Sequence, residues 1–317
     1  MADSNPMTAA GSADIRRATA GKKALSIVMI DSGMGGLSIC ARLVNGLQRQ
    51  PIAERVAVTY FNAWPDANRG YNRLQDDGER IRVFDRALIG AQAFAPDILF
   101  IACNTLSILY PQTAFSRRAP MPVIDIVGFG VDLIYEHLSG QSGSQAIILG
   151  TLTTVASRAH QRALIARGIE ARRLVAQACD QLATEIEKGP HSPRVGLMID
   201  GFMREAATHL TRSAAPVFAA LCCTHYGYAE AAFRRSLNAH VGRTPIILNP
   251  NHPMGDYLFE GFASQLQRPA ELELKVVSRI VWSEEKVTAI AEALQNLSPL
   301  TAQALRQYRH DPQFFTF

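Results

Sequence analysis

The chain has 317 residues, of which 48% are hydrophobic and 19% are charged, and its formal net charge is +4. This length and composition predict a soluble globular protein, and no apolar run reaches the roughly 20 residues that a membrane span requires. Four Lys or Arg residues and two Asp residues lie in the first 24 positions, so the rest of the chain is nearly neutral and gives no indication of nucleic-acid binding.

The first 24 residues are small, polar and unperiodic, and they lack the apolar core of a secretory signal. We therefore expect residues 1–24 to form a flexible tail. Five cysteines, an odd number in a chain without such a signal, favour reduced thiols over a disulfide framework. These features predict a cytoplasmic protein.

Short apolar segments alternate with helical segments along most of the chain. The apolar segments that run into polar turns include ALSIVMI, DILFIA, QAIILGT and VFAALC. Strands that alternate with helices indicate parallel sheets covered on both faces, so the predicted fold class is α/β. The prolines and glycines of APMPVIDIVGFG favour a domain boundary near residue 122. The closing HDPQFFTF could be an ordered tail packed through its phenylalanines.

Polar residues stand where the predicted strands end. Asp31, Cys103, Thr151 and Cys223 each follow an apolar segment directly. In open parallel sheets, ligands bind beyond the carboxyl ends of the strands. The position of these four residues makes them candidates for one site.

The first of these turns, DSGMGGLS at 31–38, is rich in glycine. A dinucleotide-binding fingerprint would need glycine at position 38, which is Ser38, and the lysine of a P-loop is also missing. The turn instead predicts backbone N–H groups at a helix N-terminus that suit a carboxylate, with a plain strand-to-helix turn as the alternative. Asp31 favours a functional role, because a carboxylate at the end of a buried strand is costly unless it caps a helix.

The second turn, ACNTLS, places Cys103 before Asn104 and Thr105 at the start of a helix. The positive end of a helix dipole favours thiolate, so we expect a lowered pKa for this thiol. The neighbouring amide and hydroxyl groups suit a substrate carboxylate or ammonium. Taken alone, Cys103 could also be an inert core cysteine.

The third turn, CCTHYGY, repeats the arrangement with Cys223, Thr224 and His225. Zinc binding by Cys222, Cys223 and His225 is one alternative, but adjacent cysteines do not match the usual spacing of zinc ligands. A Cys/His nucleophile with a distant partner is another alternative.

The three motifs in this order, Asp-Ser-Gly-x-Gly-Gly-Leu, Ala-Cys-Asn-Thr and Cys-Thr-His-Tyr, resemble those of glutamate racemases and of the wider aspartate/glutamate racemase superfamily. The resemblance extends from about Ile27 to Asn249 and includes PVIDIV, ILGTLTTVASRAH and ACDQLATEIEKG. It implies two similar three-layer domains with mainly parallel sheets and an active site in the cleft between them. We assign residues 25–122 plus 223–317 to the first domain and residues 123–222 to the second.

Racemisation without a cofactor takes the α-proton from one face of a carbon and returns a proton to the other face. Two cysteines suit this task, because a thiol has a pKa near enough to neutrality to serve as acid or base. The resemblance implies that Cys103 and Cys223 are this pair and that Asp31, His225 and Glu187 are auxiliary catalytic groups. Glu187 could instead be a solvated helix residue, and His225 a hydrogen-bonded loop residue.

The resemblance also implies a small acidic amino acid as substrate, no cofactor and no metal, a homodimer as in many members of the family, and neither a nucleic acid nor a membrane as partner. Backbone N–H groups of the glycine turn would contribute to substrate binding. The side chains expected to bind the substrate are Asp31, Ser32, Tyr71, Asn72, Asn104, Thr105 and Thr224.

One segment departs from the family pattern. Glutamate racemases usually continue after the second strand with Gly-Asp-Thr and then Pro-Tyr-Gly, whereas this chain has NAWPDANRGYNRL. Tyr71 and Asn72 are placed at the Tyr-Gly position, and Trp64 and Arg69 could reshape the pocket. The departure concerns the binding of the substrate side chain and leaves the two cysteines in place.

Two further departures are Leu106, where the family usually has a small residue, and Gly227, where proline is common. Because both cysteines are retained, we predict a cofactor-independent racemase of L- and D-glutamate that supplies D-glutamate for peptidoglycan. The alternatives are a racemase of aspartate or another amino acid, another activity of the superfamily such as isomerisation, decarboxylation or hydantoin racemisation, and an inactive binding or regulatory relative.

Overall fold

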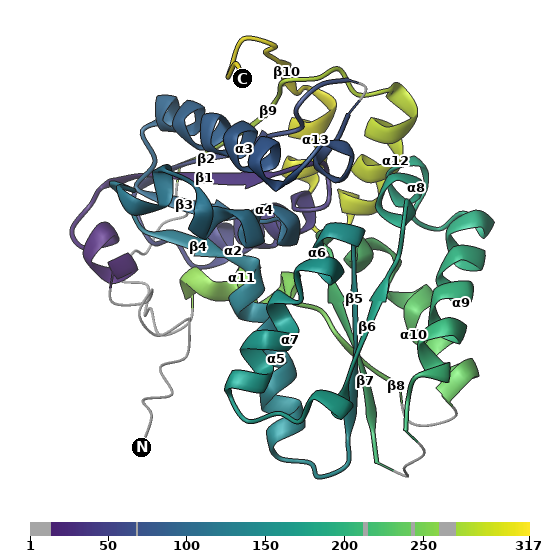
Figure 1. The fold of residues 1–317 in the computed structure, drawn as a ribbon. Helices are drawn as coiled ribbons and strands as arrows, with labels where there is room; N and C mark the ends of the chain where they lie inside the picture. The colour runs from purple at the N-terminus through teal and green to yellow at the C-terminus, as the bar shows by residue number, and fades with distance from the viewer. Residues whose placement is uncertain (1–13, 68, 212–214, 242–244, 260–270) are drawn as a thin grey trace.

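The computed structural model consists of two lobes, each built on a parallel sheet with helices on both faces (Figure 1). This architecture confirms the predicted α/β class. None of the helices in the described ranges combines the length and apolar content needed to cross a bilayer. The structure describes residues 14–67, 69–211, 215–241, 245–259 and 271–317.

The elements alternate along the chain as the sequence predicts. The strands are β1 (Ala24–Asp31), β2 (Arg55–Asn62), β3 (Ile98–Ile101), β4 (Val123–Asp125), β5 (Gln145–Gly150), β6 (Leu174–Ala178), β7 (Val217–Cys222), β8 (Pro245–Leu248), β9 (Glu271–Ser278) and β10 (Arg309–His310). The α-helices are α2 (Leu37–Arg49), α3 (Asp77–Ala91), α4 (Asn104–Leu109), α5 (Ile126–Ser139), α6 (Leu152–Ser157), α7 (Ala159–Ala166), α8 (Leu182–Lys188), α9 (Pro193–Thr208), α10 (Glu230–Val241), α11 (Asn251–Asp256), α12 (Glu284–Gln295) and α13 (Pro299–Arg306). The 3₁₀ helices are η1 (Tyr71–Arg73), η2 (Gln92–Phe94), η3 (Tyr110–Gln112), η4 (Phe115–Arg117), η5 (Ala171–Arg173), η6 (Thr224–Ala229) and η7 (Tyr257–Phe259).

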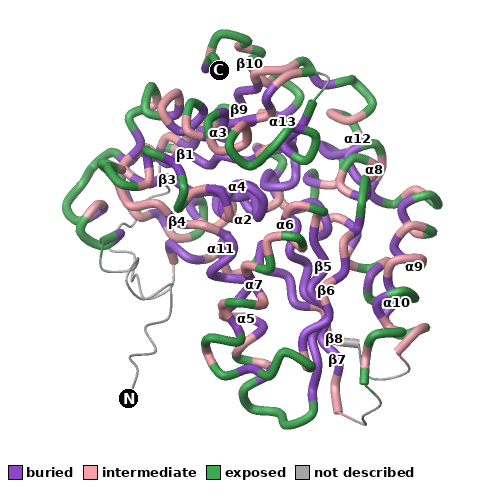
Figure 2. Tube along the Cα trace, in the orientation of Figure 1, coloured by how far each residue is buried: buried purple, intermediate pink, exposed green. Residues whose placement is uncertain are grey.

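The first sheet, with strand order β10-β9-β2-β1-β3-β4, lies between two layers of helices. Along β1, Ile27 and Met29 point into the core beneath α2, α11, α12 and α13, whereas Val28 and Ile30 point into the core beneath α3 and α4. Apolar side chains on both faces are typical of a parallel strand covered on both sides. Figure 2 shows the central strands buried beneath helices whose outer surfaces are exposed.

The second sheet, with strand order β6-β5-β7-β8, repeats this construction. Ile147 and Leu149 of β5 face α8, α9 and α10, and Ala146 and Ile148 face α5 and α7. The carboxyl ends of β1 and β3 in the first lobe and of β5 and β7 in the second lobe face the seam between the lobes.

Two short strands, β4 and β8, do not belong to the lobes to which we assigned them. β4 pairs with β3 and extends the first sheet, although residues 123–222 were assigned to the second domain. β8 pairs with β7 in the second sheet, although residues 223–317 were assigned to the first domain. The first boundary was wrong because Asp125 ends β4 and caps α5, so the chain passes to the second lobe only after this strand. The second boundary was wrong because α10 leads the chain back to the second sheet, where β8 pairs.

Part of the expected N-terminal tail is packed against the first lobe. Residues 14–19 are helical, and Ile15, which is 2% exposed, belongs to the core beneath α2. Its backbone carbonyl accepts a hydrogen bond from the Thr19 hydroxyl at 3.0 Å. Residues 1–13 of the expected tail lie outside the described residues.

The C-terminal segment is ordered through its phenylalanines, as the sequence indicated. Phe314 stacks on Phe94 with 4.9 Å between the ring centroids and also packs against Phe61. Phe315 is 5% exposed and contacts Phe61 edge to face. The segment therefore completes the core beneath α3.

Candidate active site

A pocket with about 570 Å³ of empty space opens at the seam between the lobes. Every residue that the sequence placed in the site lines this pocket, Thr151 included, together with Trp64 and two further residues of α8. The lining consists of Asp31, Ser32, Trp64, Tyr71, Asn72, Cys103, Asn104, Thr105, Thr151, Ala183, Thr184, Glu187, Cys223, Thr224 and His225.

The two cysteines reach the pocket from different lobes. Cys103 lies between β3 and α4 of the first lobe, and Cys223 lies between β7 and η6 of the second. Each is 6% exposed. Their partners differ, because the Ser32 hydroxyl oxygen lies 3.1 Å from the Cys103 sulfur, whereas His225 Nδ1 lies 3.8 Å from the Cys223 sulfur. One thiol therefore has a neutral partner and the other an ionisable one.

The Asp31 carboxylate is fully buried at the end of β1. Its Oδ2 accepts hydrogen bonds from the Gly36 N–H at 2.6 Å and from the Thr224 hydroxyl at 3.1 Å. Among the described residues, Oδ1 has no hydrogen-bond partner. Burial raises the pKa of Asp31 to about 6, although the charge of His225 and the Gly36 N–H oppose the shift.

Burial also determines the protonation of Cys103. Burial first, and then the nearby Asp31 charge, raise the pKa of the Cys103 thiol to about 12, against the hydrogen bond with Ser32. The expected lowering at a helix N-terminus was wrong, since α4 is only six residues long and desolvation outweighs its dipole. Cys103 is a neutral thiol at pH 7 and is suited to donate a proton.

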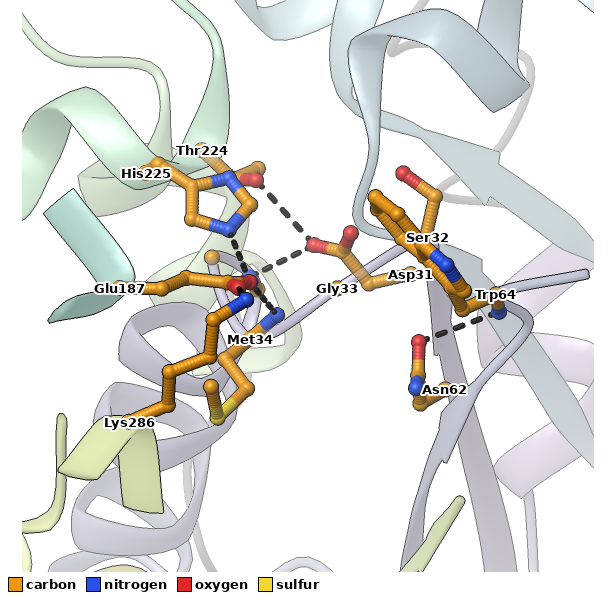
Figure 3. A network of polar contacts seen from close by, with 12 residues as sticks. Asp31, Ser32, Gly33, Met34, Asn62, Trp64, Glu187, Thr224, His225 and Lys286 are labelled. Atoms are coloured by element: carbon orange, nitrogen blue, oxygen red, sulfur yellow. Dashed lines mark hydrogen bonds and ion pairs between the residues drawn. The ribbon is translucent and has the colours of Figure 1, made fainter. Parts of the chain in front are cut away.

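The Cys223 side of the pocket contains a buried ionic network (Figure 3). Glu187 of α8 accepts a hydrogen bond from His225 Nε2 at 2.9 Å and from the Met34 N–H at 3.1 Å, both on Oε1. Its Oε2 accepts from Lys286 Nζ at 2.7 Å. Burial alone would raise the pKa of Glu187, but the hydrogen bond and charge of His225 and the charge of Lys286 outweigh it and lower this pKa to about 2.

His225 lies between the anionic Glu187 and the Cys223 sulfur. Burial alone would lower the pKa of His225, but its hydrogen bonds with Cys223 and Glu187, and the Glu187 charge, raise it well above its ordinary value. An imidazolium held in this place can stabilise a thiolate or pass a proton to it.

Glycine is required in the turn between β1 and α2 because His225 and Thr224 approach it closely. A Cβ on Gly35 would lie 2.3 Å from Thr224 Oγ1 and 2.6 Å from His225 Nδ1. A Cβ on Gly33 would lie 2.9 Å from Glu187 Oε1. The glycines of the first lobe thus allow the catalytic candidates of the second lobe to pack against the backbone.

The backbone of this turn does bind carboxylates, but they belong to the protein itself. The Gly36 N–H donates to Asp31 and the Met34 N–H donates to Glu187. These two N–H groups are already used and are not free for a substrate. The turn instead fixes two of the acidic groups of the pocket.

Unpaired polar atoms concentrate at Asn104. Among the described residues, both polar atoms of its side-chain amide are buried without a hydrogen-bond partner. A buried unsatisfied polar group costs about 1–3 kcal/mol, so such an amide is typical of a site that waits for a ligand. The neighbouring Thr105 hydroxyl lies 3.1 Å from the Thr151 hydroxyl across the seam.

The segment that departs from the family pattern forms one wall of the pocket. Tyr71 is buried, and its hydroxyl has no partner among the described residues. Asn72 Oδ1 accepts a hydrogen bond from the Thr153 hydroxyl of the second lobe at 2.6 Å. The ring of Trp64 lines the pocket and packs over Gly70, where a Cβ would lie 2.4 Å from the ring.

The other departures lie outside the pocket. Arg69 forms an ion pair with Asp66 at 3.3 Å and does not line the pocket. Leu106 is fully buried and belongs to the core beneath α3. At Gly227, an added Cβ would lie 2.9 Å from Asn251 Nδ2, so the close approach of this amide explains the glycine.

The geometry does not support the zinc alternative. Cys222 is fully buried in the apolar cluster beneath α5, whereas Cys223 packs on the opposite face of the sheet and lines the pocket. Successive strand residues point to opposite faces. The side chains of Cys222, Cys223 and His225 therefore do not converge on one point.

Three functional candidates were not predicted from the sequence. Ala183 and Thr184 precede Glu187 by four and three positions on α8, and this spacing places them on the same helix face. That signal was available once Glu187 was assigned to a helix. Lys286 gave no such signal, because it is 99 residues from Glu187 and lies in a segment without a recognised motif.

Comparison with known proteins is consistent with the fold and the motifs. A glutamate racemase from Syntrophus aciditrophicus (strain SB) is 28% identical over 207 residues, which cover 65% of this chain and 69% of that protein. The crystal structure of glutamate racemase from Campylobacter jejuni subsp. jejuni superposes with a TM-score of 0.62 at 21% identity and covers 90% of this chain and 100% of that chain. Glutamate racemase from Francisella tularensis subsp. tularensis SCHU S4, solved in complex with D-glutamate, gives a TM-score of 0.65 at 17% identity and covers 86% and 94%.

The family assignment rests on the extent of the match. The model of the Asp/Glu/Hydantoin racemase family matches residues 27–241, which include the glycine turn, both cysteine motifs and Glu187. The chain is an amino-acid racemase, an isomerase, and belongs to the Asp/Glu/Hydantoin racemase family.

Proposed function

We propose that the protein interconverts L- and D-glutamate without a cofactor and uses Cys103 and Cys223 as the acid/base pair. One observation carries the proposal: two equally exposed thiols enter the same pocket from different lobes. Groups on opposite sides of a pocket can act on opposite faces of a carbon. The relatives named above are glutamate racemases, and one of their structures holds D-glutamate.

In the proposed reaction, the Cys223 sulfur takes the α-proton from one face of the substrate, so that a C–H bond breaks and an S–H bond forms. The Cys103 thiol gives its proton to the other face and becomes a thiolate. The raised pKa of Cys103 suits a proton donor. The His225 imidazolium stabilises a thiolate at Cys223, and a thiolate suits the role of base. The opposite enantiomer reacts by the same transfers in reverse.

Substrate binding is proposed for the buried polar atoms that have no partner among the described residues. The Asn104 amide would hold the α-carboxylate with the help of Thr105. Asp31 Oδ1 would accept a hydrogen bond from the α-ammonium group, and Tyr71 would contact the side-chain carboxylate. Each contact would give a hydrogen-bond partner to a buried polar group that otherwise has none, and removal of this free-energy cost favours binding. Ser32, Asn72 and Thr224 line the same space and complete the proposed binding site.

The biological role that fits this activity is the supply of D-glutamate for peptidoglycan in the cytoplasm. The five cysteines are free thiols in the structure, and a reducing compartment suits two reactive thiols. Aspartate is the alternative substrate, because the wall that contains Trp64, Tyr71 and Asn72 departs from the pattern of glutamate racemases.

The test follows α-proton exchange in D₂O with L- and D-forms of glutamate, aspartate and several neutral amino acids, without added cofactor. We expect the wild type to exchange the α-proton of both glutamate enantiomers, and the rate of racemisation to fall at least about 10³-fold in Cys103→Ala and in Cys223→Ala. Cys40→Ala is the control, since Cys40 is buried in the core beneath α2 and does not line the pocket. Exchange with aspartate alone would show that aspartate, rather than glutamate, is the substrate. Racemisation that persists in either single variant would rule out the two-thiol mechanism.

A further inference from the structure

We propose that Lys286 is a positioning residue that holds Glu187, and through it His225, in the orientation that Cys223 needs. The inference rests on the proposed two-cysteine function and concerns one side of that site. Lys286 belongs to α12, in the part of the chain to which neither the motifs nor the family match extends.

The two oxygens of the Glu187 carboxylate have separate partners. Oε1 receives His225 Nε2 and the Met34 N–H, and within the described part of the chain Oε2 bonds to Lys286 alone, at 2.7 Å. A carboxylate with both oxygens engaged has a fixed plane. That plane sets the direction of its hydrogen bond with the imidazole ring, and the ring in turn presents Nδ1 to the Cys223 sulfur at 3.8 Å.

Lys286 also connects the two lobes at this point. Glu187 lies on α8 of the second lobe, whereas Lys286 and Met34 belong to the first, and α8 lies beside α12 in Figure 1. Figure 3 shows the Lys286 side chain directed from its helix toward the Glu187 carboxylate. Lys286 of the first lobe therefore fixes the Glu187 carboxylate of the second lobe, which lies directly behind the proposed base, Cys223.

The arrangement is one-sided. Cys103 has Ser32 as its partner, and no group of this ionic network bonds to it. Loss of Lys286 should therefore impair proton transfer at Cys223 and leave transfer at Cys103 intact. A general loss of stability would affect both sides.

The variants are Lys286→Met, which keeps the length of the side chain without its charge, and Lys286→Arg, which keeps a cationic donor. Lys188→Met is the matched control, because Lys188 forms a 2.7 Å ion pair with Glu185 on the same helix α8, and its ammonium group is not among the partners of the Glu187 carboxylate. At metal sites, loss of the hydrogen bond that orients a ligand typically costs 10–100-fold in affinity or activity, and Lys286 orients Glu187 in the same way. We expect kcat to fall by about tenfold or more in Lys286→Met and by only about threefold in Lys286→Arg.

Primary isotope effects with α-deuterated D- and L-glutamate provide a readout that a purely structural role would not change. The kcat/KM values must fall equally for both enantiomers, because the equilibrium constant between them is one. The isotope effects should become unequal in Lys286→Met, since only the step at Cys223 is slowed. Equal isotope effects in this variant, or the same loss in Lys188→Met, would overturn the proposal.

Alkylation by iodoacetamide tests the arrangement without any substrate. Cys103 and Cys223 are equally exposed, so the ratio of their alkylation rates, measured by peptide mass spectrometry at pH 7.5, reports on their chemical surroundings. We expect this ratio to change at least threefold in favour of Cys103 in Lys286→Met and to remain near wild type in Lys188→Met. If no amino acid exchanges its α-proton but the ratio changes, the proposed function fails and the positioning role stands; an unchanged ratio overturns that role.

Discussion

Burial acts on three acidic groups of the pocket with different results, and the difference lies in their partners. Glu187 has two cationic partners and remains ionised, with a pKa near 2. Asp31 has only neutral donors in contact, and burial raises its pKa to about 6, whereas Cys103 beside it remains a thiol. Neighbouring groups whose pKa values are driven apart can divide the roles of acid and base between them.

The buried Asp31 carboxylate makes stability depend on pH in a predictable direction. Its folded-state pKa, about 6, exceeds the ordinary value of 3.8, so the folded state binds the proton more tightly. The contribution of Asp31 to stability is therefore greatest below about pH 4, decreases as the pH rises from about 4 to about 6, and falls by at most about 3 kcal/mol in total. Asp31→Asn keeps an acceptor for Gly36 and Thr224 and removes the charge. We expect urea unfolding to show a gain of about 1–3 kcal/mol at pH 8 and no gain at pH 4, with loss of racemisation.

The control for this prediction is Asp180→Asn, which changes an exposed aspartate in the turn before α8. Removal of a solvated charge should change the free energy of unfolding by no more than about 0.5 kcal/mol at either pH. A gain in Asp31→Asn of the same size at pH 4 and pH 8 would show that its cause is not the buried charge.

At the scale of elements, the site consists of loops at strand ends that are braced by a glycine turn. The sequence indicated that the turn between β1 and α2 exposes N–H groups to a carboxylate. It could not indicate which carboxylate, since Glu187 is 153 residues from Met34 and reaches it only after the second lobe has folded against the first. The tight packing of this turn against η6 makes its glycines sensitive to substitution.

Gly35→Ala tests this close packing. The added Cβ would lie 2.6 Å from His225 Nδ1 and 2.3 Å from Thr224 Oγ1, so both side chains must move. A displacement of about 1 Å in a catalytic group can cost 10²-fold in rate, and overpacking typically costs about 1–3 kcal/mol in stability. We expect kcat/KM to fall by about 10²-fold and the melting temperature to fall as well.

Gly201→Ala in α9 is the counterpart, because nothing lies within 4 Å of its added Cβ. Alanine in the interior of a helix is more stable than glycine by about 0.5–1 kcal/mol. This variant should melt slightly higher and racemise at the wild-type rate. If Gly35→Ala behaved in the same way, the proposed contact with His225 would not matter for activity.

At the scale of the whole molecule, local patterns predicted the elements but not all of their pairings. Cys103, Cys223 and Asp31 could be assigned to strand ends because each follows an apolar segment, and parallel sheets gather such ends. The placement of β8 was wrong, since only pairing with β7 determines its sheet. Lys286 could not be predicted at all, because its partner lies across the seam. Contacts within one strand–turn–helix unit were therefore predictable, whereas individual pairings between the lobes, such as Lys286 with Glu187, were not.

A hydrogen bond between the lobes at the mouth of the pocket provides a test of closure. The Thr153 hydroxyl of α6 donates to Asn72 Oδ1 of η1 at 2.6 Å, and Asn72 is exposed. Such a bond is worth about 0.5–1.5 kcal/mol, or about 2–10-fold in the ratio of closed to open forms. Asn72→Ala and Thr153→Val should each raise KM for glutamate by about this factor and leave kcat nearly unchanged, since neither residue is assigned to proton transfer.

The double variant distinguishes this bond from two independent effects on the pocket wall. If both substitutions break the same hydrogen bond, KM in the double variant should rise no further than in either single variant. Steady-state racemisation measured in both directions over a range of glutamate concentrations gives the three comparisons. Additive increases in KM would mean that Asn72 and Thr153 act separately, and that the lobes are held together at the glycine turn and at the Glu187 network rather than at the mouth.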